Sequence, residues 1–153
     1  MGDPKVVLLT GCAIGGIGYE YCKALTEKNC PVFASDIPQR MQDMLDLSSD
    51  KIKTLELDVT SDESVSSAVN TVISKSGRID VLINNAGIGG TGPLAEHSLD
   101  TIREAWEMNT LGQLRLVLQV VPYMASRRSG SIVNIGSVVG RVHSHPMGRV
   151  LLC

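Results

Sequence analysis

A cluster of glycine residues near the start of the chain could bring the backbone close to a phosphate group. Gly11, Gly16 and Gly18 fall within the run TGCAIGGIG at positions 10–18. Glycine lets the chain turn sharply and leaves room for a pyrophosphate, whose charge is met by the amides that begin a helix. The pattern carries weight only where a strand precedes it and a helix follows it.

The residues on either side of this segment meet that condition. Positions 5–10 form a short aliphatic run that is typical of a buried strand, and 17–29 has the spacing of an amphipathic helix. The side chains expected on the buried face of that helix are Ile17, Tyr21, Ala24 and Leu25. The sequence therefore predicts a dinucleotide-binding turn; the alternative is a tight turn that holds no ligand.

Asp36 follows the next expected strand, 31–35, and could bind the sugar of an adenosine. A carboxylate at this position can accept hydrogen bonds from both ribose hydroxyls, and it would repel a 2′-phosphate. It therefore favours NAD over NADP. Arg40 lies close enough in the chain to accommodate that phosphate and leaves NADP open. The alternative is that Asp36 only forms a turn at the end of the strand.

Strands and helices are expected to alternate along the chain. Further strands are predicted at 53–57, 80–83 and 131–135, and a long helix at about 100–126. Thr60, with Glu63 three positions later, predicts the start of a helix that ends at Gly77. This alternation is typical of an α/β fold, a Rossmann-like doubly wound parallel sheet with helices on both faces. The whole chain, 1–153, is expected to be one domain.

Composition supports that fold and argues against several classes of partner. The 153 residues are 43% hydrophobic and only 3% aromatic, which suits aliphatic strands buried on both faces. A net charge of −2 provides no basic surface for nucleic acid. The four cysteines form no CxxC pair and are expected to be free thiols. No metal site is expected, because His143 and His145 lack a further ligand nearby.

Membrane insertion is not expected. The N-terminus has no apolar stretch typical of a signal peptide. The longest apolar run, 114–124, is broken by Arg115, Gln119 and Pro122, so it is not expected to span a bilayer. The chain is predicted to be a soluble, cytoplasmic protein.

Five motifs in order along 5–140 resemble those of the short-chain dehydrogenase/reductase family. They are Thr10-Gly11 with Gly16-Ile17-Gly18, Asp58-Val59, Asn84-Asn85-Ala86-Gly87, Asn109 within the long helix, and Ser137 in Asn134-Ile135-Gly136-Ser137. The glycine segment is one residue longer than the common family form. In this it is similar to the lipid and steroid carbonyl branch, including 1-acyldihydroxyacetone-phosphate reductase-like members. That branch implies, as an alternative location, the periphery of the endoplasmic reticulum or of lipid droplets.

The resemblance implies a role for each of these motifs. Asp58 and Val59 would contact the adenine of the cofactor, and the run Asn84-Asn85-Ala86-Gly87 would line the cofactor cleft and stabilise the central strand. Asn109 would hold a water molecule in a proton relay, although an asparagine there could also fill a kink in the helix. Ser137 would hydrogen-bond the carbonyl oxygen of the substrate and polarise it for hydride attack.

The sequence departs from the family pattern after Ser137. The family's general acid/base is a tyrosine whose pKa is lowered by a lysine four residues later. In this sequence no tyrosine follows Tyr123 and no lysine follows Lys75. We therefore expect a domain incomplete at its C-terminus and catalytically impaired. The apolar residues expected to be uncovered on the long helix are Leu111, Leu114, Val117, Leu118 and Val121.

Two functions from different classes follow from these observations. The first is an NAD(P)-dependent oxidoreductase that acts on a small-molecule carbonyl or secondary alcohol, with a lipid or steroid as one candidate. The second is a non-catalytic dinucleotide-binding fragment or truncated isoform, which pairs with full-length subunits or with itself through the helix at 100–126. A third interpretation is an unstable by-product without a function.

Overall fold

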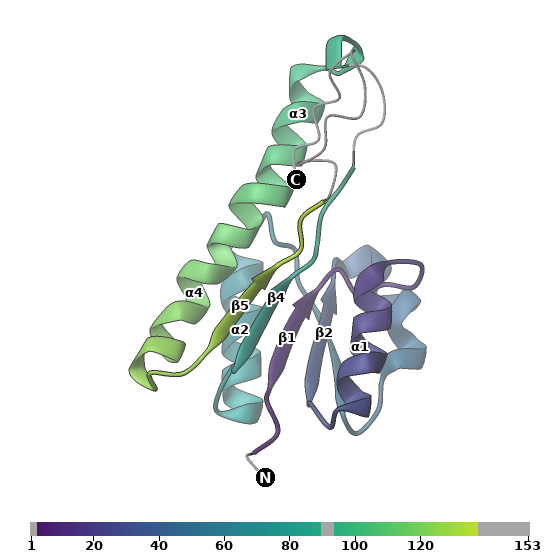
Figure 1. Cartoon of the computed structure of the whole chain (residues 1–153). Coiled ribbons are helices and arrows are strands. Elements are labelled where there is room, and N and C mark those ends of the chain that lie inside the picture. The colour runs from purple at the N-terminus through teal and green to yellow at the C-terminus, as the bar shows by residue number, and fades with distance from the viewer. Residues whose placement is uncertain (1–2, 90–93, 138–153) are drawn as a thin grey trace.

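Five parallel strands form one sheet in the order β3-β2-β1-β4-β5, as the computed structural model of the chain shows for residues 3–89 and 94–137 (Figure 1). The strands are β1 (Val7–Thr10), β2 (Val32–Asp36), β3 (Ile52–Glu56), β4 (Val81–Asn84) and β5 (Ser131–Asn134). The chain builds outward from β1 to β3, then returns to place β4 on the other side of β1. The predicted α/β, Rossmann-like fold is confirmed.

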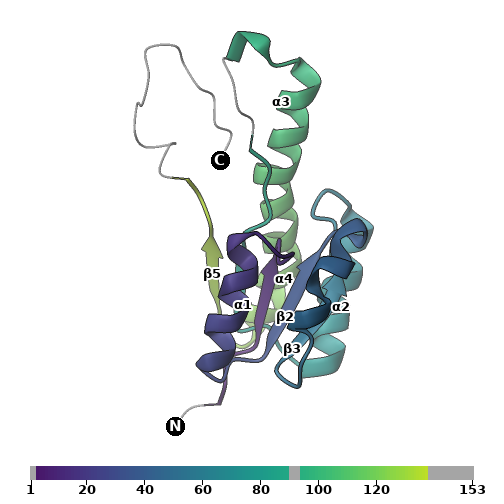
Figure 2. The same cartoon turned by 90° about the vertical axis from the view of Figure 1, so that its right-hand side faces the viewer.

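Helical segments cover both faces of this sheet (Figure 2). The α-helices are α1 (Ile17–Glu27), α2 (Asp62–Ser76), α3 (Leu99–Trp106) and α4 (Gln113–Ser126), and two 3-10 segments are η1 (Pro38–Leu47) and η2 (Leu94–Glu96). A π-helical turn, η3 (Glu107–Gly112), joins α3 to α4. The helix predicted at 100–126 is therefore present as one long helical run, but it changes its winding in the middle.

Alternating side chains of the strands divide the core into two layers. Leu8 and Leu82 pack with α2 and α4 on one face, whereas Leu9 and Ile83 pack with α1 and η1 on the other. The register of β1 sets Leu9 beside Ile83 of β4. Complete burial of one such side chain stabilises the fold by roughly 1.5–3 kcal/mol. The aliphatic strands thus hold together the edge at which the functional residues collect.

The buried face of α1 differs from the prediction. Ile17, Tyr21 and Ala24 are exposed, and Leu25 is half-buried. The side chains that face the sheet are those of Tyr19 and Cys22, next to Gly18. The reason is that α1 starts directly on the glycine turn. Gly18 is pressed against the turn itself, and this contact sets the rotation of the whole helix.

The start of α2 lies one residue later than predicted. The hydroxyl of Ser61, not that of Thr60, accepts the hydrogen bond from the Ser64 amide (3.2 Å). The Thr60 hydroxyl points instead to the loop before the helix, where it donates to the Asp58 carboxylate (2.7 Å). Gly77 ends α2 as predicted, with a φ of 73° that favours glycine.

The long helical run leaves part of its apolar surface uncovered. Of the side chains expected there, Leu114, Leu118 and Val121 are exposed, whereas Leu111 and Val117 are half-buried. The opposite side of α4 packs on the sheet through three buried residues, Leu116, Val120 and Met124. Among the described residues, no helix is both long enough and apolar enough to cross a membrane.

Candidate functional site

A cleft of about 350 Å³ opens at the carboxyl ends of the strands, over the point where the chain switches from one side of β1 to the other. Ligands of doubly wound folds bind at such a switch point. Many of the residues predicted from the sequence line it: Gly11, Gly16, Ile17, Asp36, Val59, Asn85, Ala86 and Gly87. Residues far apart in the chain therefore meet at one edge of the sheet.

The glycine turn is packed so tightly that two of its glycines leave no room for a side chain. A Cβ atom on Gly18 would lie 2.2 Å from the Gly11 carbonyl oxygen, and one on Gly11 would lie 2.9 Å from the Ala86 Cα. Gly11 also has a φ of +71°, in the left-handed region. These glycines bring the backbone of β1, of α1 and of the segment after β4 together at the floor of the cleft.

The start of α1 is suited to an anion. Its N-cap residue is Gly16, and no side chain caps its first-turn amides. Ser61 and Ser98, by contrast, cap the starts of α2 and α3 with their hydroxyls. Amides at the start of a helix carry a partial positive charge. Because Gly16 and Ile17 line the cleft, the residues present fit the pyrophosphate of a dinucleotide.

Thr10 and Asn84 do not line the cleft, but their hydrogen bonds fix the segment that does. Thr10 is buried, and its hydroxyl accepts hydrogen bonds from the amides of Asn85 (3.0 Å) and Ala86 (2.9 Å). The buried side chain of Asn84 donates to Oδ1 of Asn134 (2.8 Å), on the neighbouring strand. These bonds hold the segment after β4 against β1 and β5.

Asp36 and Arg40 lie at the sugar end of the cleft, where the sequence predicts ribose binding. The Asp36 carboxylate accepts hydrogen bonds from the amides of Ala13 (2.8 Å) and Ile37 (2.9 Å). Each carboxylate oxygen can accept a further bond, so these contacts orient the group and leave it able to bind hydroxyls. Arg40 donates to the Ile14 carbonyl (3.1 Å), which ties η1 to the glycine turn.

The adenine end differs from what the motif suggests. Val59 and Leu57 line the cleft, but Asp58 does not. The Asp58 carboxylate accepts hydrogen bonds from the amide (2.9 Å) and the hydroxyl of Thr60, so it shapes the loop that carries Val59. The sequence analysis missed Leu57, Ile88 and Met108 as lining residues. Leu57 and Ile88 adjoin predicted motifs, whereas the position of Met108 depends on the π turn.

Asn109 and Ser137 come together in a smaller pocket of about 140 Å³. This pocket shares the segment from Asn85 to Ile88 with the larger cleft, so the two are neighbours. Asn109 is buried; its Oδ1 accepts from the Ile88 amide (2.9 Å), and its Nδ2 donates to the Ile88 carbonyl (2.8 Å). Asn109 lies inside the π turn, as expected for an asparagine that occupies a distortion of the helix.

A third cavity of about 280 Å³ lies between α4 and the end of β5. Its lining combines the apolar side chains of Leu114 and Val117 with the amides of Gln113 and Asn134. Asn109 lines both this cavity and the pocket that holds Ser137. A molecule bound here could therefore place a polar group close to Ser137 while its apolar part contacts α4.

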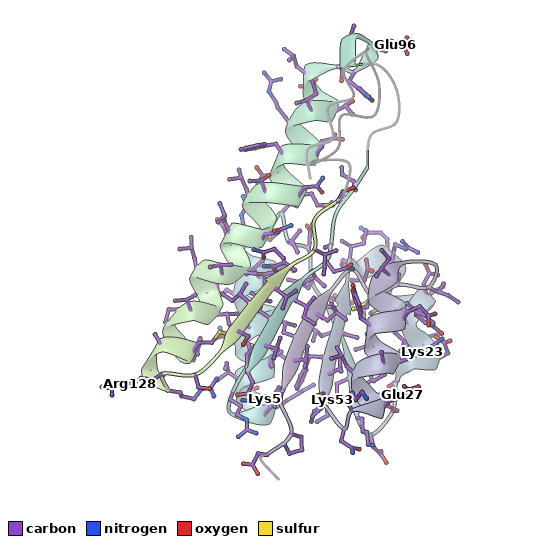
Figure 3. All side chains as sticks on the ribbon, in the orientation of Figure 1. Lys5, Lys23, Glu27, Lys53, Glu96 and Arg128 are labelled. Atoms are coloured by element: carbon purple, nitrogen blue, oxygen red, sulfur yellow. The ribbon has the colours of Figure 1, made fainter. Side chains whose placement is uncertain are left out.

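Tyr19 and Lys23 have the spacing of a Tyr-x-x-x-Lys pair, but they lie in a different part of the fold. The Tyr19 hydroxyl donates to the carboxylate of Asp46 in η1, and the Lys23 ammonium lies over the Tyr19 ring (4.1 Å). Figure 3 shows Lys23 on the side of α1 that is remote from α4. The hydrogen bond to Asp46 raises the pKa of Tyr19, which is opposite to what a tyrosine base requires.

Some residues considered in the sequence analysis lie outside the described residues. They are His143, His145 and the positions that follow Ser137. Within residues 3–89 and 94–137, no three His, Cys, Asp or Glu side chains gather as they would around a metal ion.

Comparison with known proteins places these features in one family. Residues 5–148 match the model of the family described as short chain dehydrogenase. Human retinol dehydrogenase 8 is 37% identical over 145 residues, which are 90% of this chain and 45% of that protein. The chain thus spans about half the length of this relative.

Solved structures show the same likeness. A short-chain dehydrogenase from Streptomyces avermitilis superposes with a TM-score of 0.84 at 32% identity, over 92% of this chain and 52% of that one. A structure of ElxO with NADP bound has a TM-score of 0.83 at 30% identity, over 95% of this chain and 60% of that one.

Proposed function

Because this chain belongs to the short-chain dehydrogenase family, we propose that its cleft binds a nicotinamide adenine dinucleotide for the oxidation or reduction of a small molecule. The observation that carries this proposal is the cradle formed by Gly11, Gly18 and the uncapped start of α1. When bound, the dinucleotide supplies or accepts a hydride at its nicotinamide ring. The protein itself binds the pyrophosphate and the adenosine and positions the substrate next to the nicotinamide ring.

NAD is the favoured cofactor. The Asp36 carboxylate is fixed at the cleft by the amides of Ala13 and Ile37, and it would repel a 2′-phosphate. Arg40 also lines the cleft and would attract that phosphate. ElxO, similar in fold, holds NADP, so family membership is compatible with either cofactor. The charge and fixed orientation of Asp36 favour NAD.

The reaction proposed is hydride transfer between the cofactor and a carbonyl or secondary alcohol. Ser137 would donate a hydrogen bond to the carbonyl oxygen and polarise it. Asn109 would hold a water molecule that relays a proton, while its bonds to Ile88 keep it in place. What supports these roles is that both side chains line one pocket next to the cofactor cleft.

A lipid or steroid-like molecule is the substrate class we favour. The cavity beside Ser137 is apolar on the α4 side, where Leu114 and Val117 line it. One of the relatives is named for retinol, a long apolar alcohol. The longer glycine turn, at 10–18, is a further point of similarity to this branch. A cytoplasmic location, or one at the surface of the endoplasmic reticulum or lipid droplets, remains a prediction.

A second candidate function is dinucleotide binding without turnover, in association with another subunit. The one Tyr-x-x-x-Lys pair among the described residues begins at Tyr19, whose hydroxyl is bonded to Asp46 in a different part of the fold from the cleft. The outer surface of α4 carries Leu118, which is 74% exposed, together with Leu114 and Val121. Apolar side chains gathered on one exposed helix are typical of a contact surface.

Binding and turnover assays on the 153-residue chain test both functions. We expect calorimetry to detect weak binding that is tighter for NADH than for NADPH, and oxidation of NADH by a panel of carbonyl compounds distinguishes the oxidoreductase from the non-catalytic binder. Turnover that disappears on changing Ser137→Ala would support the enzyme and contradict the non-catalytic alternative. If the chain binds neither NADH nor NADPH, the proposed role of the cleft is wrong.

A further inference from the structure

The π turn between α3 and α4 touches both walls of the cleft. On one side, Asn109 bonds the backbone of Ile88 through both ends of its amide. On the other, Gly112 approaches Val59 so closely that a Cβ would lie 2.7 Å from Val59 Cγ2. Met108, in the same turn, lines the cleft itself. π turns inserted into α-helices occur frequently at functional sites.

Arg115 follows this turn and joins it to the wall that carries Val59. Its Nε donates to Oδ1 of Asp62, in the first turn of α2 (2.7 Å), and its Nη2 donates to the carboxylate of Glu107, the first residue of the π turn. Its Nη1 makes a long contact of 3.4 Å with the Val59 carbonyl. One guanidinium therefore links α2, the π turn and the loop after β3.

The energy of these ion pairs does not by itself explain the arrangement. Asp62 is 81% exposed, and exposed ion pairs contribute only about 0–1 kcal/mol to stability. Geometry is the more informative property, because the planar guanidinium holds several acceptors in fixed directions. Arg115 is itself mostly buried, with its side chain 22% exposed. The residue that it contacts, Val59, is 5% exposed and lines the cleft.

We infer that Arg115 is a positioning residue for the adenine end of the cleft. It holds the loop of Val59 against the π turn, while Asn109 holds the segment of Ile88 on the opposite wall. The π turn thereby sets the distance between the walls. This inference rests on the proposed function, since it takes the dinucleotide as the ligand whose adenosine contacts Val59.

Replacing Arg115→Met tests the inference, since methionine keeps the apolar stem and removes all three contacts. The ligands are ADP-ribose, which has the adenosine half, and nicotinamide mononucleotide, titrated by calorimetry and NMR. We expect the affinity for ADP-ribose to fall by about tenfold. Affinity for nicotinamide mononucleotide should change by less than about twofold, because Asn109 still holds its wall. Arg103→Met is the matched control, because Arg103 lies in the same helical run, is exposed and pairs with the exposed Asp100.

A purely structural role would produce a different pattern. It would weaken both ligands equally, or lower stability and leave the affinity for ADP-ribose unchanged; either result overturns the inference. Arg115→Lys, which keeps one charge without the fork, should restore only part of the affinity. Glu107→Gln provides a milder variant of the same contact if Arg115→Met does not fold.

A measurement without ligand separates this inference from the proposed function. Hydrogen exchange at the amides of Thr60 and Ser61 should be faster in Arg115→Met, while exchange at Ile88 stays unchanged. Unchanged exchange at Thr60 and Ser61 would overturn the positioning role. If the unmodified chain binds neither ligand, the proposed function fails, and the exchange rates still decide whether Arg115 holds the loop.

Discussion

Asn85 donates two hydrogen bonds to Thr10, one from its backbone and one from its side chain. The Thr10 hydroxyl accepts from the Asn85 amide (3.0 Å), and the side-chain amide of Asn85 donates to the Thr10 carbonyl (2.9 Å). A second amide, that of Ala86, also donates to the hydroxyl (2.9 Å). Two segments distant in the chain, the end of β1 and the residues after β4, are held together in this way at the floor of the cleft.

Changing Thr10→Val should lower the free energy of unfolding by about 2–4 kcal/mol. Valine keeps the shape but leaves two amides, those of Asn85 and Ala86, without their acceptor, and each such loss costs about 1–3 kcal/mol. Urea denaturation measures the change. Thr10→Ser keeps the hydroxyl and serves as the control. Equal stability of the valine and serine variants would contradict the prediction.

Changing Gly18→Ala should reduce dinucleotide affinity by at least about tenfold, since the added methyl would lie 2.2 Å from the Gly11 carbonyl oxygen. The glycine turn must move to relieve this contact, and the start of α1 moves with it. Quenching of protein fluorescence by NADH reports the affinity. Gly89→Ala is the matched control, because a Cβ there meets nothing within 4 Å. Retained affinity in Gly18→Ala would show that the cradle is not the binding site.

Changing Arg40→Gln should weaken NADPH binding by about fivefold, the size of one charged contact, and leave NADH binding unchanged. The basis is that Arg40 lines the cleft beside Asp36, where a 2′-phosphate would lie. Parallel titrations with the two cofactors measure the ratio of their dissociation constants. A similar loss for both cofactors would indicate that Arg40 supports the glycine turn through Ile14 and does not contact the phosphate.

The buried carboxyl of Asp80 should make stability depend on acid pH. Burial would raise its pKa, but the hydrogen bond from the Val6 amide, with Arg127 and Arg78, outweighs burial and holds the pKa below its ordinary value of 3.8. A lowered pKa stabilises the folded state above pH 3.8, and that contribution is lost as the pH falls through the folded value.

Asp80→Asn tests this dependence. We expect a loss of about 2–4 kcal/mol at pH 7, because the charged partners Arg78 and Arg127 remain. The difference from the unmodified chain should shrink as the pH falls below 3.8, which urea denaturation at several pH values would show. Asp100→Asn, at an exposed ion pair, should have little effect at any pH. A difference independent of pH would contradict this account.

The cysteines should react with alkylating agents at very different rates. Cys12 and Cys22 are fully buried, whereas Cys30 is partly exposed. Burial also raises the pKa of the Cys12 thiol, so little thiolate is present at neutral pH. Of the three cysteines that the structure describes, iodoacetamide should modify Cys30 first, and NADH should slow the reaction of Cys12 further, because Cys12 lies within the glycine turn. Mass spectrometry of the peptides gives each rate; equal rates would contradict the burial.

The sequence alone was enough for the features that depend on neighbouring residues. The strands were predicted to within one or two positions, because aliphatic runs end where glycine or a polar residue begins. The alternation of strands with helices then restricts the topology, since parallel strands require right-handed crossovers. The position of Gly18 between a strand and a helix pointed to the same edge of the sheet that Asp36 and Asn85 reach.

Features set by packing between distant segments required the tertiary structure. The rotation of α1 follows from the contact of Gly18 with Gly11, so the apolar spacing of the helix predicted the wrong face. The Asp58 carboxylate accepts a hydrogen bond from the Thr60 amide and is not among the residues that line the cleft, which the motif alone does not predict. Met108, which lines the cleft, lies in the π turn, and the sequence pattern does not predict that change of winding.

The sequence by itself was sufficient for the motif that contains Thr10, Asn85 and Gly18. Their types and order predict a dinucleotide-binding turn, because glycines and a strand end are local properties of the chain. Only the tertiary structure shows that Asn109 and Ser137 share a pocket. It also shows that Tyr19 is bound to Asp46 outside that pocket. The physical reason is that side chains acquire their direction from contacts between segments, which spacing along one segment does not contain.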